Sequence, residues 1–101
     1  MNKKDISNIG SLIQKGEFFL AQKKIEELIS SEPNNLSYRN ILAIIYANQK
    51  KFKDSIIILK KIIKQSPKFI DAYINLGNIY CDLNQLIDSE NYFKEVIKID
   101  S

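Results

Sequence analysis

The chain has 101 residues, of which 45% are hydrophobic and 27% charged, and its net charge is +3. These values are typical of one small soluble globular domain, and no apolar run approaches the roughly 18 residues of a membrane span. The single cysteine, Cys81, excludes an intrachain disulfide, so we expect a reducing, cytoplasmic location.

Apolar residues at helical spacing predict six helices in chain order, arranged as three pairs. The expected ranges are about 4–15 and 18–31, 36–49 and 52–65, and 70–83 and 86–99. Gly16, Lys50 and Asn84 separate the two helices of each pair, where glycine and asparagine suit a left-handed helix end better than lysine does. Pro33 and Pro67 separate the pairs, because proline prevents the preceding helix from continuing. Connections this short make neighbouring helices antiparallel.

The helix pairs repeat with a period of 34 residues. Residues one period apart are of similar type along the chain, among them Gly77 and Ala43, Ser89, Ser55 and Ala21, and Pro67 and Pro33. Such agreement at a single offset indicates an internal repeat of three units. We name them unit one (residues 2–35), unit two (36–69) and unit three (70–101).

Three helix–turn–helix units of this length, with "AYINLGNIY" in unit three, a small residue early in each second helix and a proline at the end, resemble tetratricopeptide repeats. Unit three matches the family pattern best, and unit two departs from it at Arg39, where a large aromatic is usual. Unit one is degraded, because Asp5, Asn8 and Ile9 replace large apolar, leucine and small residues. The resemblance implies an all-α, right-handed α-solenoid of three repeats and six antiparallel helices, forming a single domain over residues 1–101 with no separate C-terminal capping helix.

The resemblance also explains why a predicted helix contains Gly77, although an internal glycine costs roughly 1 kcal/mol relative to alanine. In the family pattern Gly77 and Ser89 mark the closest crossing of the two helices of a unit, and Ala43 with Ser55 repeats the arrangement. The glycine is therefore expected to be structural, and a branched side chain there is expected to overpack the crossing.

The sequence does not indicate catalytic or cofactor chemistry. It has no histidine, which removes the commonest general base and metal ligand. It contains no glycine-rich phosphate loop, nucleophile elbow or metal-ligand spacing, and Cys81 has no histidine to activate it. We therefore expect a non-enzymatic protein that uses no cofactor or metal and whose function is binding.

In the tetratricopeptide family a stripe along each first helix faces a concave groove. The predicted groove residues are Ile6, Ile13, Asn40, Ile41, Ile44, Asn48, Ile74, Asn75 and Asn78. The isoleucines favour an apolar or amphipathic partner segment, unless they pack within the solenoid itself. The amides either bond to a peptide backbone or are simply solvated. The family's carboxylate clamp for heat-shock chaperone tails is not expected, because the basic residues it needs are absent and Asp71 has the opposite charge.

Charge is distributed unevenly, with a net charge of +7 in unit two and −4 in unit three. The possible basic patch consists of Lys50, Lys51, Lys53, Lys60, Lys61 and Lys64. These lysines either form a solvated helix face or contact an acidic partner, RNA or anionic lipid headgroups. Nucleic acid is disfavoured, because the chain has one arginine and its aromatic residues fall on packing positions.

The last helix is expected to leave apolar residues such as Ile97 and Ile99 uncovered. A longer repeat array, fusion to another domain and self-association through this helix are the alternatives that follow. The sequence thus predicts a protein-interaction adaptor. The alternative is an N-terminal regulatory or substrate-docking module of a larger enzyme.

Overall fold

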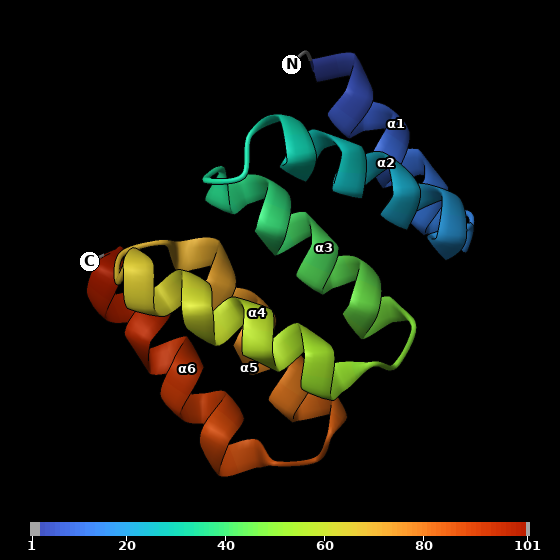
Figure 1. The fold of residues 1–101 in the computed structure, drawn as a ribbon. Helices are drawn as coiled ribbons and strands as arrows, with labels where there is room; N and C mark the ends of the chain where they lie inside the picture. The colour runs from blue at the N-terminus through green and yellow to red at the C-terminus, as the bar shows by residue number, and fades with distance from the viewer. Residues whose placement is uncertain (1–2, 101) are drawn as a thin grey trace.

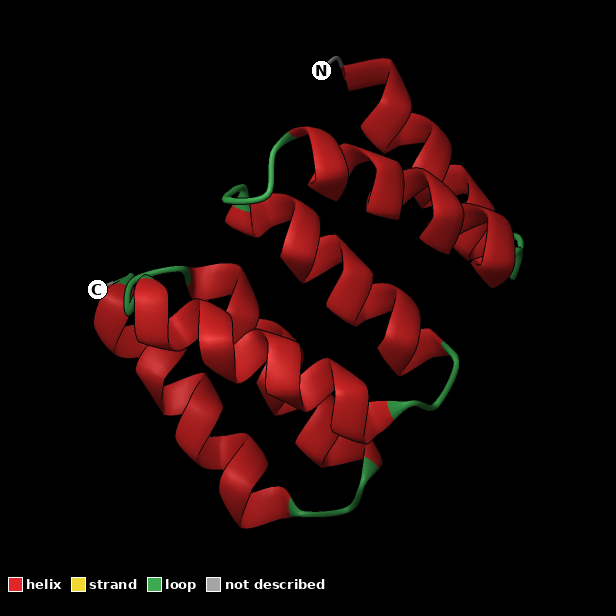
Figure 2. Ribbon diagram, in the orientation of Figure 1, coloured by secondary structure: helices red, strands yellow, loops and turns green. Residues whose placement is uncertain are grey.

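The computed structural model describes residues 3–100, and this part of the chain contains six α-helices and no strands (Figures 1 and 2). The helices are α1 (Lys3–Gln14), α2 (Phe18–Ser31), α3 (Leu36–Asn48), α4 (Phe52–Gln65), α5 (Ile70–Asp82) and α6 (Leu86–Ile99). The second helix of each pair has the predicted bounds, and each first helix ends one residue earlier than predicted. The predicted outer ends of units one and three, residues 2 and 101, lie outside the described residues.

The helices stack in chain order, each one antiparallel to the next (Figure 1). The first helices of units two and three, α3 and α5, also contact each other directly, so these two helices lie on the same side of the stack. The molecule measures 34 × 25 × 21 Å along its principal axes. This arrangement confirms the predicted all-α solenoid of three helix–turn–helix repeats.

The two helices of every unit are joined by the same turn, which contains one residue in the left-handed conformation. The φ angle is 78° at Gly16, 65° at Lys50 and 59° at Asn84. The next backbone N–H bonds to a carbonyl five residues earlier, as Lys51 does to Tyr46 at 2.9 Å, which satisfies a carbonyl at the helix end. The predicted left-handed turns are confirmed, and Lys50 adopts this conformation although its Cβ disfavours it.

The close helix crossing in unit three is confirmed at Gly77. A Cβ added there would lie 2.6–2.9 Å from atoms of the Phe93 ring, well inside van der Waals contact. The serines opposite the small residues also form hydrogen bonds that the sequence did not predict. Ser89 Oγ donates to the Gly77 carbonyl at 2.8 Å, and Ser55 Oγ donates to the Ala43 carbonyl at 2.7 Å.

The hydrophobic core consists of two clusters, and α3 contributes to both. The N-terminal cluster comprises Ile9, Ala21, Ile25, Tyr38 and Ile45. The C-terminal cluster comprises Ala43, Leu59, Ile62, Ala72, Leu76 and Ile79. Because buried apolar side chains are the main source of stability, α3 connects the two halves of the solenoid energetically as well as in space.

Candidate partner-binding groove

A pocket of about 280 Å³ opens between α3 and α5. Four predicted groove residues line it, Ile44 and Asn48 from α3 and Asn75 and Asn78 from α5. The remaining lining residues are Ala43, Ala47, Lys50, Ser55, Ile79 and Asp82. The pocket therefore combines apolar surface with carboxamides, a mixture suited to a segment with apolar side chains and a hydrogen-bonding backbone.

Two of the predicted asparagines bond to each other across this pair of helices. Asn75 Nδ2 donates to Asn40 Oδ1 at 2.9 Å. Asn40 is buried, with only 7% of its surface exposed. Because a buried carboxamide needs a hydrogen-bond partner, the bond to the buried Asn40 side chain holds the Asn75 side chain in position. Asn48 Nδ2 donates to the Ile44 carbonyl at 2.8 Å. Asn78 is exposed, and its carboxamide bonds to none of the described residues.

The predicted groove isoleucines fall into two groups. Ile13 and Ile41 pack against the N-terminal cluster, so they contribute to the fold. Ile44 and Ile74 are half-buried, and Ile6 is 38% exposed. The α3–α5 pocket includes Ile44 and none of the other four. Ile44 is therefore the isoleucine whose substitution best separates binding from folding.

All six lysines of the predicted basic patch are exposed. Lys50 lines the α3–α5 pocket, and Lys51 Nζ lies 5.8 Å from the centre of the Tyr46 ring. The pKa of Lys60 is raised above its ordinary value, mainly by a hydrogen bond with the Tyr80 side chain. Among the described side chains none of the six lysines is in an ion pair, whereas Lys94 pairs with Glu90 within α6.

Two opposite charges also line the groove, Lys50 of the predicted basic patch and Asp82. Asp82 lies four residues after Asn78, a spacing that places both on one helix face, so the sequence contains the signal for it. Lys50 belongs to the turn after α3, where helical spacing makes no prediction.

None of the helices in residues 3–100 has both the length and the apolar character needed to cross a membrane. The same residues contain no group of three His, Cys, Asp or Glu side chains placed to hold a metal ion. The Cys81 thiol is free and exposed.

Comparison with known proteins identifies the repeats. Residues 58–91, which run from α4 into α6, match the sequence model of the tetratricopeptide repeat. Heat shock protein STI1 of Saccharomyces cerevisiae is 30% identical over 82 residues, which are 81% of this chain and 13% of that protein. A UDP-N-acetylglucosamine–peptide N-acetylglucosaminyltransferase of Caenorhabditis elegans is 33% identical over 76 residues, 75% of this chain and 7% of that protein. The chain thus spans a small part of the length of these relatives.

Solved structures share the fold at lower sequence identity. MamA from Desulfovibrio magneticus RS-1 superposes with a TM-score of 0.79 at 16% identity, covering 95% of this chain and 54% of that one. A tetratricopeptide repeat protein from Parabacteroides merdae gives a TM-score of 0.73 at 18% identity, covering 94% of this chain and 38% of that one. Residues 58–91 thus match the tetratricopeptide repeat, and the chain shares the fold of a solved tetratricopeptide repeat protein.

Proposed function

We propose that the chain is a protein-interaction adaptor that holds an apolar or amphipathic partner segment in the groove formed by its first helices. The observation that carries this proposal is the α3–α5 pocket, where Ile44 lies with Asn48, Asn75 and Asn78. The match to the tetratricopeptide repeat supports it, because stacked repeats present extended concave surfaces to their partners. We further propose that the chain acts as a single non-catalytic domain in the cytoplasm.

Each side chain of the pocket has a distinct role in this proposal. Ile44 supplies apolar contact, and the exposed Asn78 carboxamide can donate to and accept from one peptide group. The bond from Asn75 to Asn40 holds Asn75 in place before a partner arrives, which reduces the entropy lost on binding. Lys50 and Asp82, at the same pocket, favour one direction of a charged or dipolar segment over the other.

Peptides selected from a displayed random library, and then measured one by one by fluorescence polarisation, test the groove. Ile44→Lys is expected to weaken binding at least about tenfold, because it places a charge on the apolar contact. The matched control is Ile57→Lys, which alters an exposed isoleucine of α4 that does not line the pocket. Both variants are expected to melt close to the wild type. Peptides that bind the two variants equally well would contradict the proposal.

The exposed lysines support an acidic partner as a second part of the proposal. Such binding should weaken steeply between low and physiological salt, since exposed charges are screened over about 8–10 Å. Replacing Lys53, Lys60, Lys61 and Lys64 by glutamine should remove the salt dependence. An acidic peptide whose affinity is the same for both chains at low salt would identify the lysines as a solubilising face.

The alternative proposal is a regulatory or substrate-docking module of a larger enzyme. It is supported by the match to the N-acetylglucosaminyltransferase. The matching segment makes up 7% of the length of that enzyme. The reading frame after Ser101 distinguishes the two proposals. A stop codon there supports the adaptor, and a catalytic domain downstream supports the docking module.

We also propose that α6 mediates self-association. Its Leu86, Ile87 and Ile97 are 60%, 80% and 68% exposed. Phe52 and Ile63, the α4 residues one period before Leu86 and Ile97, instead pack against the C-terminal cluster, to which α5 contributes. A second copy of the chain offers the apolar surface that α6 lacks.

Sedimentation at tens of micromolar should show a dimer that tightens with salt, because unit three carries a net charge of −4. A monomer at both low and high salt would contradict this.

A further inference from the structure

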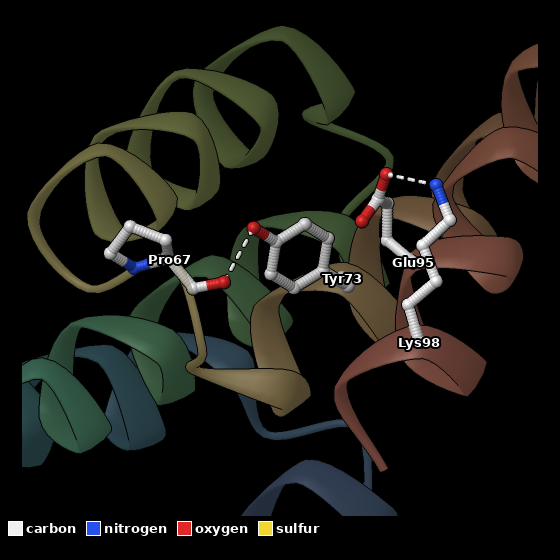
Figure 3. Close-up of polar contacts among 4 residues, drawn as sticks. All are labelled: Pro67, Tyr73, Glu95 and Lys98. Atoms are coloured by element: carbon white, nitrogen blue, oxygen red, sulfur yellow. Dashed lines mark hydrogen bonds and ion pairs between the residues drawn. The ribbon is translucent and has the colours of Figure 1, made fainter. Parts of the chain in front are cut away.

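In units two and three the first helix begins just after a proline turn, and in unit three Tyr73 packs at this place. The Tyr73 hydroxyl donates to the Pro67 carbonyl at 2.7 Å, and the residue is only 8% exposed (Figure 3). Its ring centre lies 6.4 Å from that of Tyr92. Burial, and then the nearby charge of Glu95, raise the pKa of Tyr73. An aromatic ring thus fills this position next to an acidic side chain.

Unit two keeps the hydrogen bond but has no ring. Arg39 lies one period before Tyr73, and its Nε donates to the Pro33 carbonyl at 2.9 Å. At the position of Tyr92 unit two has Ile58. A cavity of about 330 Å³ opens here, which we name the join pocket. Its apolar lining includes Leu36, Ile58 and Ile62, and its charged lining is Arg39 and Lys61.

Lys61 of the join pocket lies one period before Glu95, which pairs with Lys98 at 3.6 Å (Figure 3). Among the described side chains, neither Arg39 nor Lys61 is paired with a carboxylate. The bond to Pro33 occupies Nε and leaves the two terminal nitrogens of Arg39, which can hold both oxygens of one carboxylate.

Unit one provides a second internal comparison. The equivalent cavity there measures about 90 Å³, and Asp5 and Glu27 occupy the positions of Arg39 and Lys61. A larger cavity lined by two cations therefore occurs at this position in unit two and not in unit one.

We propose that the join pocket is a second binding site, separate from the α3–α5 groove, for a carboxylate carried on a small apolar body. Arg39 and Lys61 bind the carboxylate, and Leu36, Ile58 and Ile62 contact the apolar part. A planar carboxylate matches the guanidinium, and the apolar lining disfavours a fully hydrated anion such as inorganic phosphate. The carboxylate can belong to an acidic side chain of a partner or to a free organic acid.

Nuclear magnetic resonance on the ¹⁵N-labelled chain tests the site directly, because the Arg39 Nε–H group gives its own signal. We expect 4-methylbenzoate to shift this signal in a saturable manner and the neutral 4-methylbenzamide to leave it unchanged. The capped peptides Leu-Glu-Leu and Leu-Gln-Leu then identify the source: tighter binding of the glutamate peptide than of 4-methylbenzoate indicates a protein partner, and the reverse indicates an organic acid. Equal shifts with the benzamide, or saturable binding of inorganic phosphate alone, would overturn the proposal.

Substitutions locate the binding. Arg39→Tyr introduces the unit-three residue, which preserves a donor to Pro33 and fills the cavity. It should weaken 4-methylbenzoate binding at least about tenfold, followed through the backbone amide signals because the variant has no Arg39 Nε–H. Lys61→Glu, which also introduces the unit-three residue, should likewise weaken 4-methylbenzoate binding. This variant provides the test if Arg39→Tyr does not fold. Lys15→Gln, which alters an exposed cation just after α1 that does not line the join pocket, is the control and should bind as the wild type does. Undiminished binding in Lys61→Glu would refute the site.

Discussion

Units one and three fill the same helix crossing with side chains of different size. In unit three Gly77 faces the edge of the Phe93 ring, so the first helix contributes no side chain and the second contributes a large one. In unit one the equivalent position of the first helix is Ile9, which is 1% exposed and clusters with the buried Ala21 and Ile25. The difference shows that a crossing is specified by the combined volume of its facing residues. Each unit is consequently sensitive at a different position.

Replacing a glycine by alanine should change the free energy of unfolding in opposite directions in units three and one, and this is the largest difference expected between them. Gly77→Ala is expected to lower the free energy of unfolding by about 1–3 kcal/mol, because the new methyl group overlaps the Phe93 ring. The same substitution at Gly10 of α1, where a Cβ meets nothing within 4 Å, should raise it by about 0.5–1 kcal/mol. Urea denaturation measures both. Adding Phe93→Leu to Gly77→Ala should recover part of the loss, and a change of the same sign at both glycines would contradict the close crossing.

Removal of the serine hydroxyls tests the second difference between the units, because unit one has Ala21 at this position. Ser89→Ala is expected to lower the free energy of unfolding by about 1 kcal/mol through loss of the bond to the Gly77 carbonyl. Ser55→Ala should act similarly in unit two. Ser30→Ala, at an exposed position of α2, is the matched control and should be neutral or slightly stabilising. Equal effects at Ser89 and Ser30 would show that the buried bond contributes nothing.

The free energy of unfolding measured as a function of pH tests the hydrogen bond that Tyr73 makes in unit three and Arg39 replaces in unit two. The neutral Tyr73 hydroxyl donates to Pro67, and its folded pKa is raised above the ordinary value of 10.0. Its contribution is therefore complete below pH 10 and is lost as the pH rises through the folded pKa. Tyr73→Phe should lower the free energy of unfolding by about 1 kcal/mol at neutral pH, and this deficit should shrink above pH 10. A deficit that stays constant up to pH 11 would mean that the hydroxyl bond is not responsible.

The smallest effect is expected at the turns, where the units differ only in the residue that adopts positive φ. Lys50→Gly should raise the free energy of unfolding by about 0.5–1 kcal/mol, since it relieves the Cβ of a left-handed residue. Asn84→Gly should give a smaller gain, because asparagine tolerates this conformation. Thermal melts of the two variants suffice to rank them. A larger gain at Asn84 than at Lys50 would contradict the assignment of strain.

The sequence by itself determined the helices, the turns and the repeat. Gly16 and Asn84 indicate where the first helices end because left-handed backbone is a local preference of these residue types. Pro33 and Pro67 mark the joins for an equally local reason. The period of 34 aligns Gly77 with Ala43, and the resemblance to the tetratricopeptide pattern implied that both lie at a close helix crossing. All of these features depend on one residue or on a spacing along the chain.

The tertiary structure alone decided which side chains meet across units. Arg39 departs from the family pattern, yet it makes the same bond to a proline carbonyl as Tyr73 does, and the missing ring leaves the join pocket. Spacing does not distinguish Ile41 from Ile44, whereas in the structure Ile41 packs against the N-terminal cluster and Ile44 lines the α3–α5 pocket. The physical reason is that contacts between helices depend on the rotation of each helix about its axis and on side-chain rotamers. Residue spacing within one helix constrains neither of them closely enough.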